Sequence, residues 1–184
     1  AQVRLQAISL LASFGLSVAL EPLRQAANDP EEYVRQTAIE VVVGLRDQSS
    51  SLDMLIQATN DSRSWIADNA IVALGTFGQH APLELFLSFL AKPTFLHATL
   101  KALSQKEMFG LVPIQPLLDL YERNWEEREH ILEALTRSGY SVVTTLLMDE
   151  FCTNTQFATS ITIARLLAQK EALTAQNITI FEDR

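Results

Sequence analysis

The sequence predicts an all-α protein, a solenoid of about six two-helix repeats, and three observations support this fold class. Apolar anchor residues recur along the whole chain at intervals of 31, 32, 29, 32 and 31 residues. Within a repeat, apolar residues follow one another at offsets of three and four, which marks one face of a helix. Residues that end or cap helices stand between the repeats. The anchors are Leu11, Val42, Leu74, Leu103, Leu135 and Leu166.

Each repeat is predicted to be a helix, a turn and a second helix. In the second unit the leading helix carries its apolar face from Val34 to Val42, and the second helix from Leu52 to Thr59. The second halves of the first two units agree independently, because residues 23–29 and 55–61 are identical at five of seven positions. The expected units are 1–29, 30–61, 62–92, 93–123, 124–153 and 154–184.

These units are expected to form one array over residues 1–184, since a chain of this length can share one continuous core. Asn-Asp-Pro at 28–30, Asn-Asp-Ser at 60–62 and Lys-Pro-Thr at 92–94 provide the breaks between the first four units. The last unit runs out near residues 177–181 without a clear second helix. Because terminal repeats normally carry polar caps, the sequence is expected to be a piece of a longer polypeptide.

An aromatic residue recurs at the first turn of the leading helix in every unit but the first. Such a series could be a ladder that stacks bases or sugars. It could instead fill the seam with the preceding helix pair, because one pair cannot bury its apolar face alone. The second interpretation is favoured. The residues are Tyr33, Trp65, Phe95, Trp125 and Phe157, at intervals of 32, 30, 30 and 32.

The segment 29–38, Asp-Pro-Glu-Glu-Tyr-Val-Arg-Gln-Thr-Ala, resembles the start of a HEAT-like repeat of the type first noted in phycobilin lyases. In that family an Asp-Pro turn leads into a Val-Arg-x-x-Ala helix. The first unit repeats the helix with residues 3–7, and the third unit carries Ala67 where the family prefers Arg. The resemblance covers about the first 92 residues by motif and the rest by period. It implies a right-handed superhelix whose second helices line a concave face.

Composition and motifs exclude several classes of function. The net charge is −8, and no cluster of Lys and Arg is present, so nucleic acid is not an expected partner. No apolar run reaches the roughly 18 to 20 residues of a membrane helix, so direct membrane insertion is not expected. One Cys and three scattered His offer no zinc-ligand spacing, and no metal or cofactor is predicted. The pattern of a signal peptide is absent, which favours the cytoplasm.

The sequence favours a non-catalytic protein-binding scaffold or adaptor that uses the concave face of the solenoid. Repeat solenoids expose an extended surface, and no nucleotide-binding or nucleophile motif supplies a catalytic residue. The expected partner is a protein or peptide, or another domain of the same polypeptide. The alternative is a chromophore (bilin) lyase-like protein that holds a tetrapyrrole in the concave groove. Arg4 and Arg35 are expected to tie neighbouring repeats together by reaching carboxylates or carbonyls at the turns.

Candidate binding residues come from positions on the second helices that do not fit the core stripe. In the third unit Leu85 and Phe89 are left over from that stripe, and they lie four residues apart on one side of the helix. The same side is polar in the other units, so an apolar centre with a polar rim is predicted. Alternatively, Leu85 and Phe89 pack on the next repeat. The candidate residues are Asp53, Gln57, Leu85, Phe89, Gln115 and Asp119.

Overall fold

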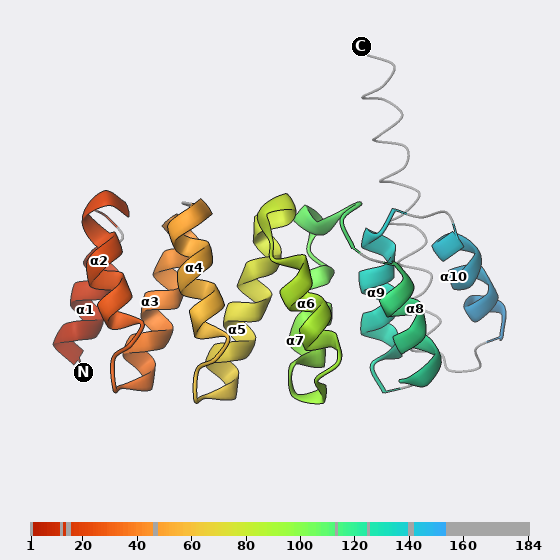
Figure 1. Ribbon diagram of the computed structural model, residues 1–184, viewed down its shortest axis with the longest axis horizontal. Coiled ribbons are helices and arrows are strands. Elements are labelled where there is room, and N and C mark those ends of the chain that lie inside the picture. The colour runs from red at the N-terminus through yellow and green to blue at the C-terminus, as the bar shows by residue number, and fades with distance from the viewer. Residues whose placement is uncertain are drawn as a thin grey trace, which may run out of the picture. The chain divides into compact units, whose positions relative to one another are not determined.

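The computed structural model describes residues 2–11, 13, 16–45, 48–112, 114–124, 126–139 and 142–153. These residues form ten α-helices and contain no strand, which confirms the predicted all-α fold class (Figure 1). None of the described helices combines the length and the apolar character that crossing a membrane requires.

The helices follow the predicted order of leading and second helices. The leading helices are α1 (Gln2–Leu11), α3 (Glu32–Leu45), α5 (Ser64–Leu74), α7 (Pro93–Leu103) and α9 (Arg128–Arg137). The second helices are α2 (Leu16–Ala26), α4 (Gln48–Ala58), α6 (Leu83–Leu90), α8 (Ile114–Arg123) and α10 (Val142–Thr153). Two short 3-10 helices, η2 (Gly75–His80) and η3 (Lys106–Met108), follow α5 and α7. The sixth predicted unit, 154–184, lies outside the described residues.

The chain divides into two compact units, Ala1–Ala102 and Leu103–Arg184. From here on these two are the first and the second unit, and the predicted two-helix units are called repeats. In the first unit the leading helices α1, α3 and α5 pack on one another in sequence (Figure 1). Helices α2 and α4 each pack against the leading helix of their own pair and that of the next pair. In the second unit α9 packs against both α8 and α10. Each helix pair is thus completed by its neighbour, which is the construction of an α-solenoid.

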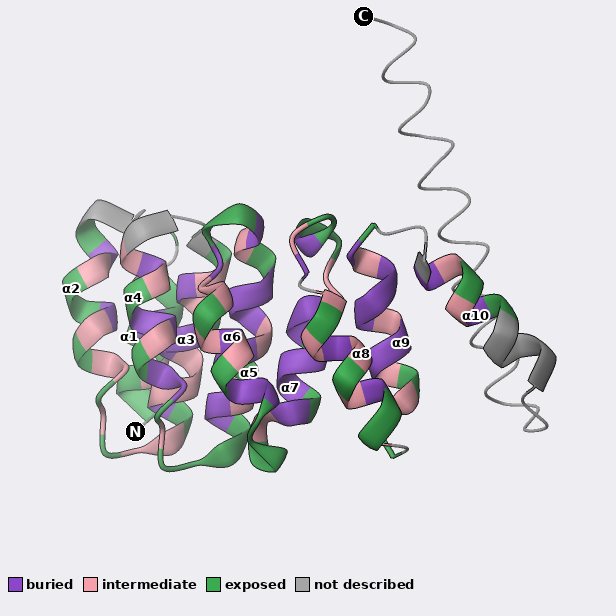
Figure 2. Ribbon diagram, turned by 45° about the vertical axis from the view of Figure 1, so that its right-hand side comes forward, coloured by how far each residue is buried: buried purple, intermediate pink, exposed green. Residues whose placement is uncertain are grey.

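The predicted anchors form the core of each unit. Val42, Leu74, Leu103 and Leu135 are all 0% exposed and occupy equivalent places late in their leading helices. Leu11 differs, because it is only half-buried. Helix α1 packs against α2 and α3 on one side, and much of its other side is exposed (Figure 2). Leu166 lies outside the described residues.

The turns between the first three helix pairs are closed by aspartates. The Asp29 Oδ1 atom accepts a hydrogen bond of 2.9 Å from the backbone N–H of Glu31. The Asp61 Oδ1 atom accepts one of 2.9 Å from the backbone N–H of Arg63. An aspartate that bonds the backbone two residues on makes a local turn, and here it ends one repeat and starts the next. The Asn-Asp signals in the sequence therefore have a direct structural cause.

Gly75 lies where the end of α5 comes close to the backbone of α7. It follows the last residue of α5, and its φ of −62° is an ordinary helical value. A Cβ atom at this position would lie 2.4 Å from the carbonyl oxygen of Ala102 in α7 and 2.9 Å from its Cα. Both contacts are with backbone, which cannot swing away as a side chain could. Glycine is required at this position by space.

We expect Gly75→Ala to lower the free energy of unfolding by about 1 to 3 kcal/mol, because the added methyl forces the α5 and α7 backbones apart. Gly44→Ala in α3 is the matched control, since no described atom lies within 4 Å of its added Cβ. That control should gain about 0.4 to 1 kcal/mol from reduced chain entropy. Urea titration followed by circular dichroism measures both, and equal effects of the two substitutions would contradict the close approach.

Candidate functional site

The second helices of the first unit carry an exposed polar ridge. Asp53 and Gln57 are exposed on α4, four residues apart and therefore on one side of the helix. Glu21 and Gln25 occupy the equivalent positions on α2, 32 residues earlier, and are also exposed. We call these four residues the α2–α4 ridge. The predicted binding residues Asp53 and Gln57 are thus on the surface.

The equivalent positions on α6, Leu85 and Phe89, are less exposed than predicted. Leu85 is half-buried, and Phe89 is only 4% exposed. The ring of Phe89 packs on the ring of Phe95 in α7, with centroids 5.1 Å apart. Phe89 is therefore a core residue that joins α6 to the next leading helix. The prediction that Phe89 is exposed is wrong. The alternative prediction, that Phe89 packs on the next repeat, is correct.

Gln115 and Asp119, the remaining predicted binding residues, lie in the second unit. Both are exposed on α8, four residues apart. The Gln115 Nε2 atom donates a hydrogen bond of 2.9 Å to Asp119 Oδ1. This pair forms a polar surface on the second unit by itself. We describe it separately from the α2–α4 ridge.

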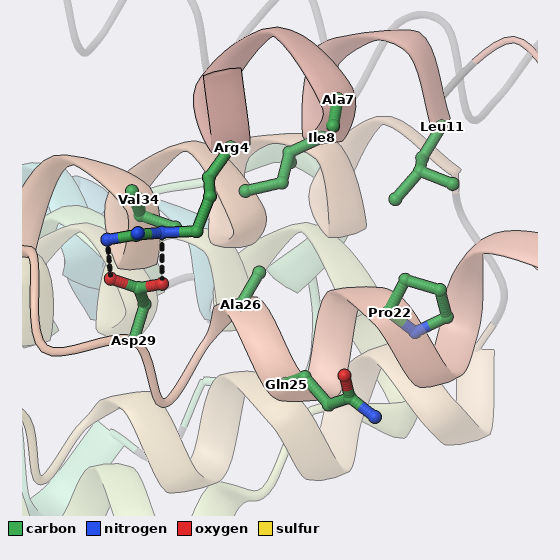
Figure 3. A pocket seen from close by; sticks show the side chains of 9 residues that line it. All are labelled: Arg4, Ala7, Ile8, Leu11, Pro22, Gln25, Ala26, Asp29 and Val34. Atoms are coloured by element: carbon green, nitrogen blue, oxygen red, sulfur yellow. Dashed lines mark hydrogen bonds and ion pairs between the residues drawn. The ribbon is translucent and has the colours of Figure 1, made fainter. Parts of the chain in front are cut away.

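A groove of about 270 Å³ opens between α1 and α2 in the first unit (Figure 3). Its walls are mostly apolar, and Gln25 of the α2–α4 ridge contributes one polar group to its lining. Arg4 and Asp29 close one end, where two dashed contacts join the guanidinium to the carboxylate (Figure 3). The lining residues are Arg4, Ala7, Ile8, Leu11, Pro22, Gln25, Ala26, Asp29 and Val34.

The groove lies next to exposed apolar residues of α1. Val3 on α1 is 79% exposed, whereas its equivalents Val34 and Ile66 in the next two leading helices are 1% and 0% exposed. Ala7 is likewise exposed, and its equivalent Ala38 is fully buried. The surface around the groove is therefore built for apolar contact. Its single carboxylate, Asp29, is already paired, so the lining residues offer no set of metal ligands.

Arginine binds aspartate at the turns that end the first two repeats, where the sequence predicts contacts from Arg4 and Arg35 to carboxylates or carbonyls. The Arg4 Nε atom lies 2.8 Å from Asp29 Oδ2, and its Nη2 donates to Oδ1 at 3.0 Å. In the next repeat Arg35 binds Asp61 through two hydrogen bonds, from Nε at 2.6 Å and from Nη2 at 2.9 Å. Arg35 Nη1 also donates to the carbonyl oxygen of Asp29 at 2.9 Å. This second pair is the more buried of the two, with side chains 12% and 7% exposed.

Hydrogen bonding lowers the pKa of both aspartates. The Arg35 guanidinium holds the pKa of the Asp61 carboxyl below its ordinary value of 3.8, and the Arg63 backbone N–H acts in the same direction. The pKa of Asp29 is lowered mainly by the Glu31 backbone N–H, with a further contribution from Arg4. Burial opposes the shift at both positions. Both carboxylates are therefore charged at neutral pH and act as structural anions.

The described members of the recurring aromatic series differ in how far they fill the predicted seams. Tyr33 on α3 is 60% exposed and Trp65 on α5 is 37% exposed, although their rings contact each other with centroids 6.1 Å apart. Phe95 is half-buried against Phe89. Trp125 and Phe157 lie outside the described residues. The prediction is therefore wrong for Tyr33, whose ring extends past the seam into solvent.

Comparison with known proteins supports the repeat assignment. Residues 20–104 match the family model described as HEAT repeats. The chain is also similar to AP-1 complex subunit beta-1 of Mus musculus and of Homo sapiens, with 29% identity over 124 residues in each case. The matched part covers 63% of this chain and 13% of either relative. The chain thus contains HEAT-like repeats and spans a small part of the length of these relatives.

Proposed function

We propose that this chain is a non-catalytic protein-binding scaffold that holds a segment of a partner protein along the α2–α4 ridge and the adjoining groove. The two relatives reported above are named as subunits of a complex, which is consistent with protein partners. A helical-repeat array offers a broad surface for such contacts. The proposed binding surface lies entirely within the first unit.

The observation that carries this proposal is the separation of surface from core on the second helices. Asp53 and Gln57 are exposed on either side of Leu55, which is 0% exposed. On α2, Glu21 and Gln25 are exposed on either side of Leu23, also 0% exposed. The buried leucines hold the helices in place without help from the ridge. The ridge side chains are therefore available for hydrogen bonds with a partner.

The groove adds an apolar contact next to these polar groups. Pro22 and Gln25 of α2 form one wall, so a partner segment on the ridge can insert a side chain between α1 and α2. An apolar centre beside polar groups is the usual composition of a protein-binding patch. The volume of about 270 Å³ lies below the range of sites that enclose drug-sized molecules. It suits one apolar side chain better than a tetrapyrrole, and the similarities reported above give no support to the lyase alternative.

The proposal predicts that Asp53→Ala combined with Gln57→Ala weakens partner binding by about tenfold or more, which corresponds to about 1.4 kcal/mol. Proteins that the wild-type chain captures from a lysate of its source are identified by mass spectrometry, and their binding is then measured with purified material. The control is Glu40→Ala with Asn69→Ala, two exposed positions on leading helices. All variants should melt within a few degrees of the wild type.

Equal binding by the ridge variant and the control would contradict the use of the ridge. Visible absorbance of the purified chain after incubation with a bilin tests the alternative function directly. Stable bilin absorbance that remains with the protein through gel filtration would favour the lyase-like reading. The two measurements are independent, so each function can fail separately.

A further inference from the structure

A second surface of the first unit carries exposed aromatic rings that the proposed scaffold function does not use. Tyr33 and Trp65 stand at the second residue of α3 and of α5, respectively. Their rings lie with centroids 6.1 Å apart and planes inclined at 44°, and they remain 60% and 37% exposed. Exposed aromatic side chains at neighbouring repeats form a platform with electron-rich faces. We call these two residues the ring pair.

The next repeat shows what the same position can bind. Phe95, 30 residues after Trp65, is the following member of the aromatic series. The Lys92 Nζ atom lies 5.8 Å from the centre of its ring and 5.3 Å from the centre of the Phe89 ring. An ammonium group at this distance is attracted by the ring quadrupole. The chain itself thus places a cation over the aromatic position in this repeat.

The ring pair lacks such a lysine. Three residues before Phe95 the sequence has Lys92, but the equivalent residues before Tyr33 and Trp65 are Pro30 and Ser62. The aromatic position is therefore kept in these two repeats without the cation that covers it in the next one. The exposed parts of the two rings remain available to a cation from another molecule.

Charges near the ring pair also favour a cation. Arg35 is paired with Asp61, and Arg63 forms an ion pair with Glu32, so each of these arginines is compensated by a carboxylate. Glu31 adds a further negative charge in the turn before α3, with no ion pair to any described residue. The whole chain carries a net charge of −8. A basic partner is therefore attracted to this surface at a distance and retained by the rings at contact.

We propose that the ring pair is a binding site for a Lys or Arg side chain from a basic, extended peptide segment of a partner protein. The cation lies over the exposed faces of Tyr33 and Trp65, as Lys92 lies over Phe95. This site is on the first turns of leading helices, whereas the α2–α4 ridge is on second helices. It therefore goes beyond the proposed scaffold function.

The test uses a peptide of four Arg-Ser repeats with blocked ends and, as a control, the same peptide with citrulline in place of arginine. Citrulline keeps the planar shape of the side chain and removes its charge. Binding to the full chain is measured by isothermal titration calorimetry at low salt. We expect Trp65→Leu to weaken binding of the arginine peptide by about tenfold, or about 1.4 kcal/mol, because leucine has no aromatic face to attract the cation. Trp65→Phe, which keeps an aromatic face, should lose less.

Tyr33→Leu provides a second variant in which folding is not at risk, because this side chain is 60% exposed. It should also weaken the arginine peptide severalfold without changing the melting temperature. Neither leucine variant alters the net charge, so non-specific attraction to an acidic chain stays constant across the series. Equal binding of the citrulline peptide, or unchanged binding by both leucine variants, would overturn the proposal. Absence of measurable binding by the arginine peptide would do the same.

These outcomes separate the two proposals. The ridge substitutions Asp53→Ala and Gln57→Ala should leave the affinity for the arginine peptide unchanged within about twofold, because they lie on α4. If the ring-pair variants bind normally while the ridge variant loses its partner, only the ring-pair site is wrong. If the ridge variant keeps its partner while the ring-pair variants lose the peptide, only the ridge is wrong.

Discussion

Leu74→Ala is expected to lower the free energy of unfolding of the first unit by about 2 to 5 kcal/mol. Leu74 is the last residue of α5, is 0% exposed, and is among the largest fully buried side chains of the described residues. Its removal leaves a cavity in the core of the first unit. Because protein interiors are close-packed and relax only in part around such a cavity, the lost contacts are not recovered.

The measurement is a urea titration in a Trp125→Phe background, in which Trp65 is the remaining tryptophan and reports on the first unit. Leu10→Ala is the matched control, because Leu10 is 63% exposed on α1. This control should cost less than about 0.5 kcal/mol, as most surface substitutions do. A loss below about 1 kcal/mol at Leu74 would mean that this anchor does not belong to the core.

The repeat period predicted the fold because it depends on features that every repeat shares. Val42, Leu74, Leu103 and Leu135 are buried at equivalent places, as their spacing indicates. A periodic apolar residue is surrounded by equivalent positions in each interior repeat, so its burial follows from the period alone. Leu11 shows the limit of this reasoning. Its own sequence context fits the pattern, but its exposure depends on what packs against the outer side of α1.

The candidate site was less predictable, because burial on the second helices is decided by residues of the next repeat. Phe89 and Gln57 occupy equivalent positions, yet Phe89 is buried because the ring of Phe95 lies 5.1 Å away. The offset pattern within α6 contains no information about that contact. Tyr33 shows the opposite error, since an aromatic residue in the series was expected to fill a seam and is largely exposed.

The groove between α1 and α2 was missed for a related reason. Its lining residues, such as Ile8 and Pro22, have ordinary apolar or turn-forming character in the sequence. A comparison of repeats treats the first repeat as equivalent to the others, so it predicts that Ala7 is buried as Ala38 is. The apolar surface of α1 at Val3 and Ala7 is exposed, whereas the equivalent surface of α3 at Val34 and Ala38 is buried. The Arg4 and Arg35 pairings were predicted, because both partners recur with the repeat.

Asp61→Asn is expected to lower the free energy of unfolding by roughly 2 to 4 kcal/mol at neutral pH. Arg35 and Asp61 are 12% and 7% exposed and share two short hydrogen bonds, so the substitution leaves a largely buried guanidinium without its anion. Asparagine retains an oxygen that can accept the Arg63 N–H, and the turn is preserved. The matched control is Asp29→Asn in the preceding repeat, where the side chain of the partner Arg4 is 52% exposed. Solvent screens that pair, so its loss should be clearly smaller.

The same pair predicts how stability changes with pH. The folded-state pKa of Asp61 is lowered below 3.8, so its contribution is fully present above the unfolded-state pKa and is lost as pH falls through the folded-state pKa. The wild type should therefore lose stability below about pH 4 more steeply than Asp61→Asn. Urea titrations of the two proteins from pH 7 downward should show a large difference in free energy that shrinks in acid. A difference that stays constant across this range would show that the carboxylate charge of Asp61 is not what Arg35 requires.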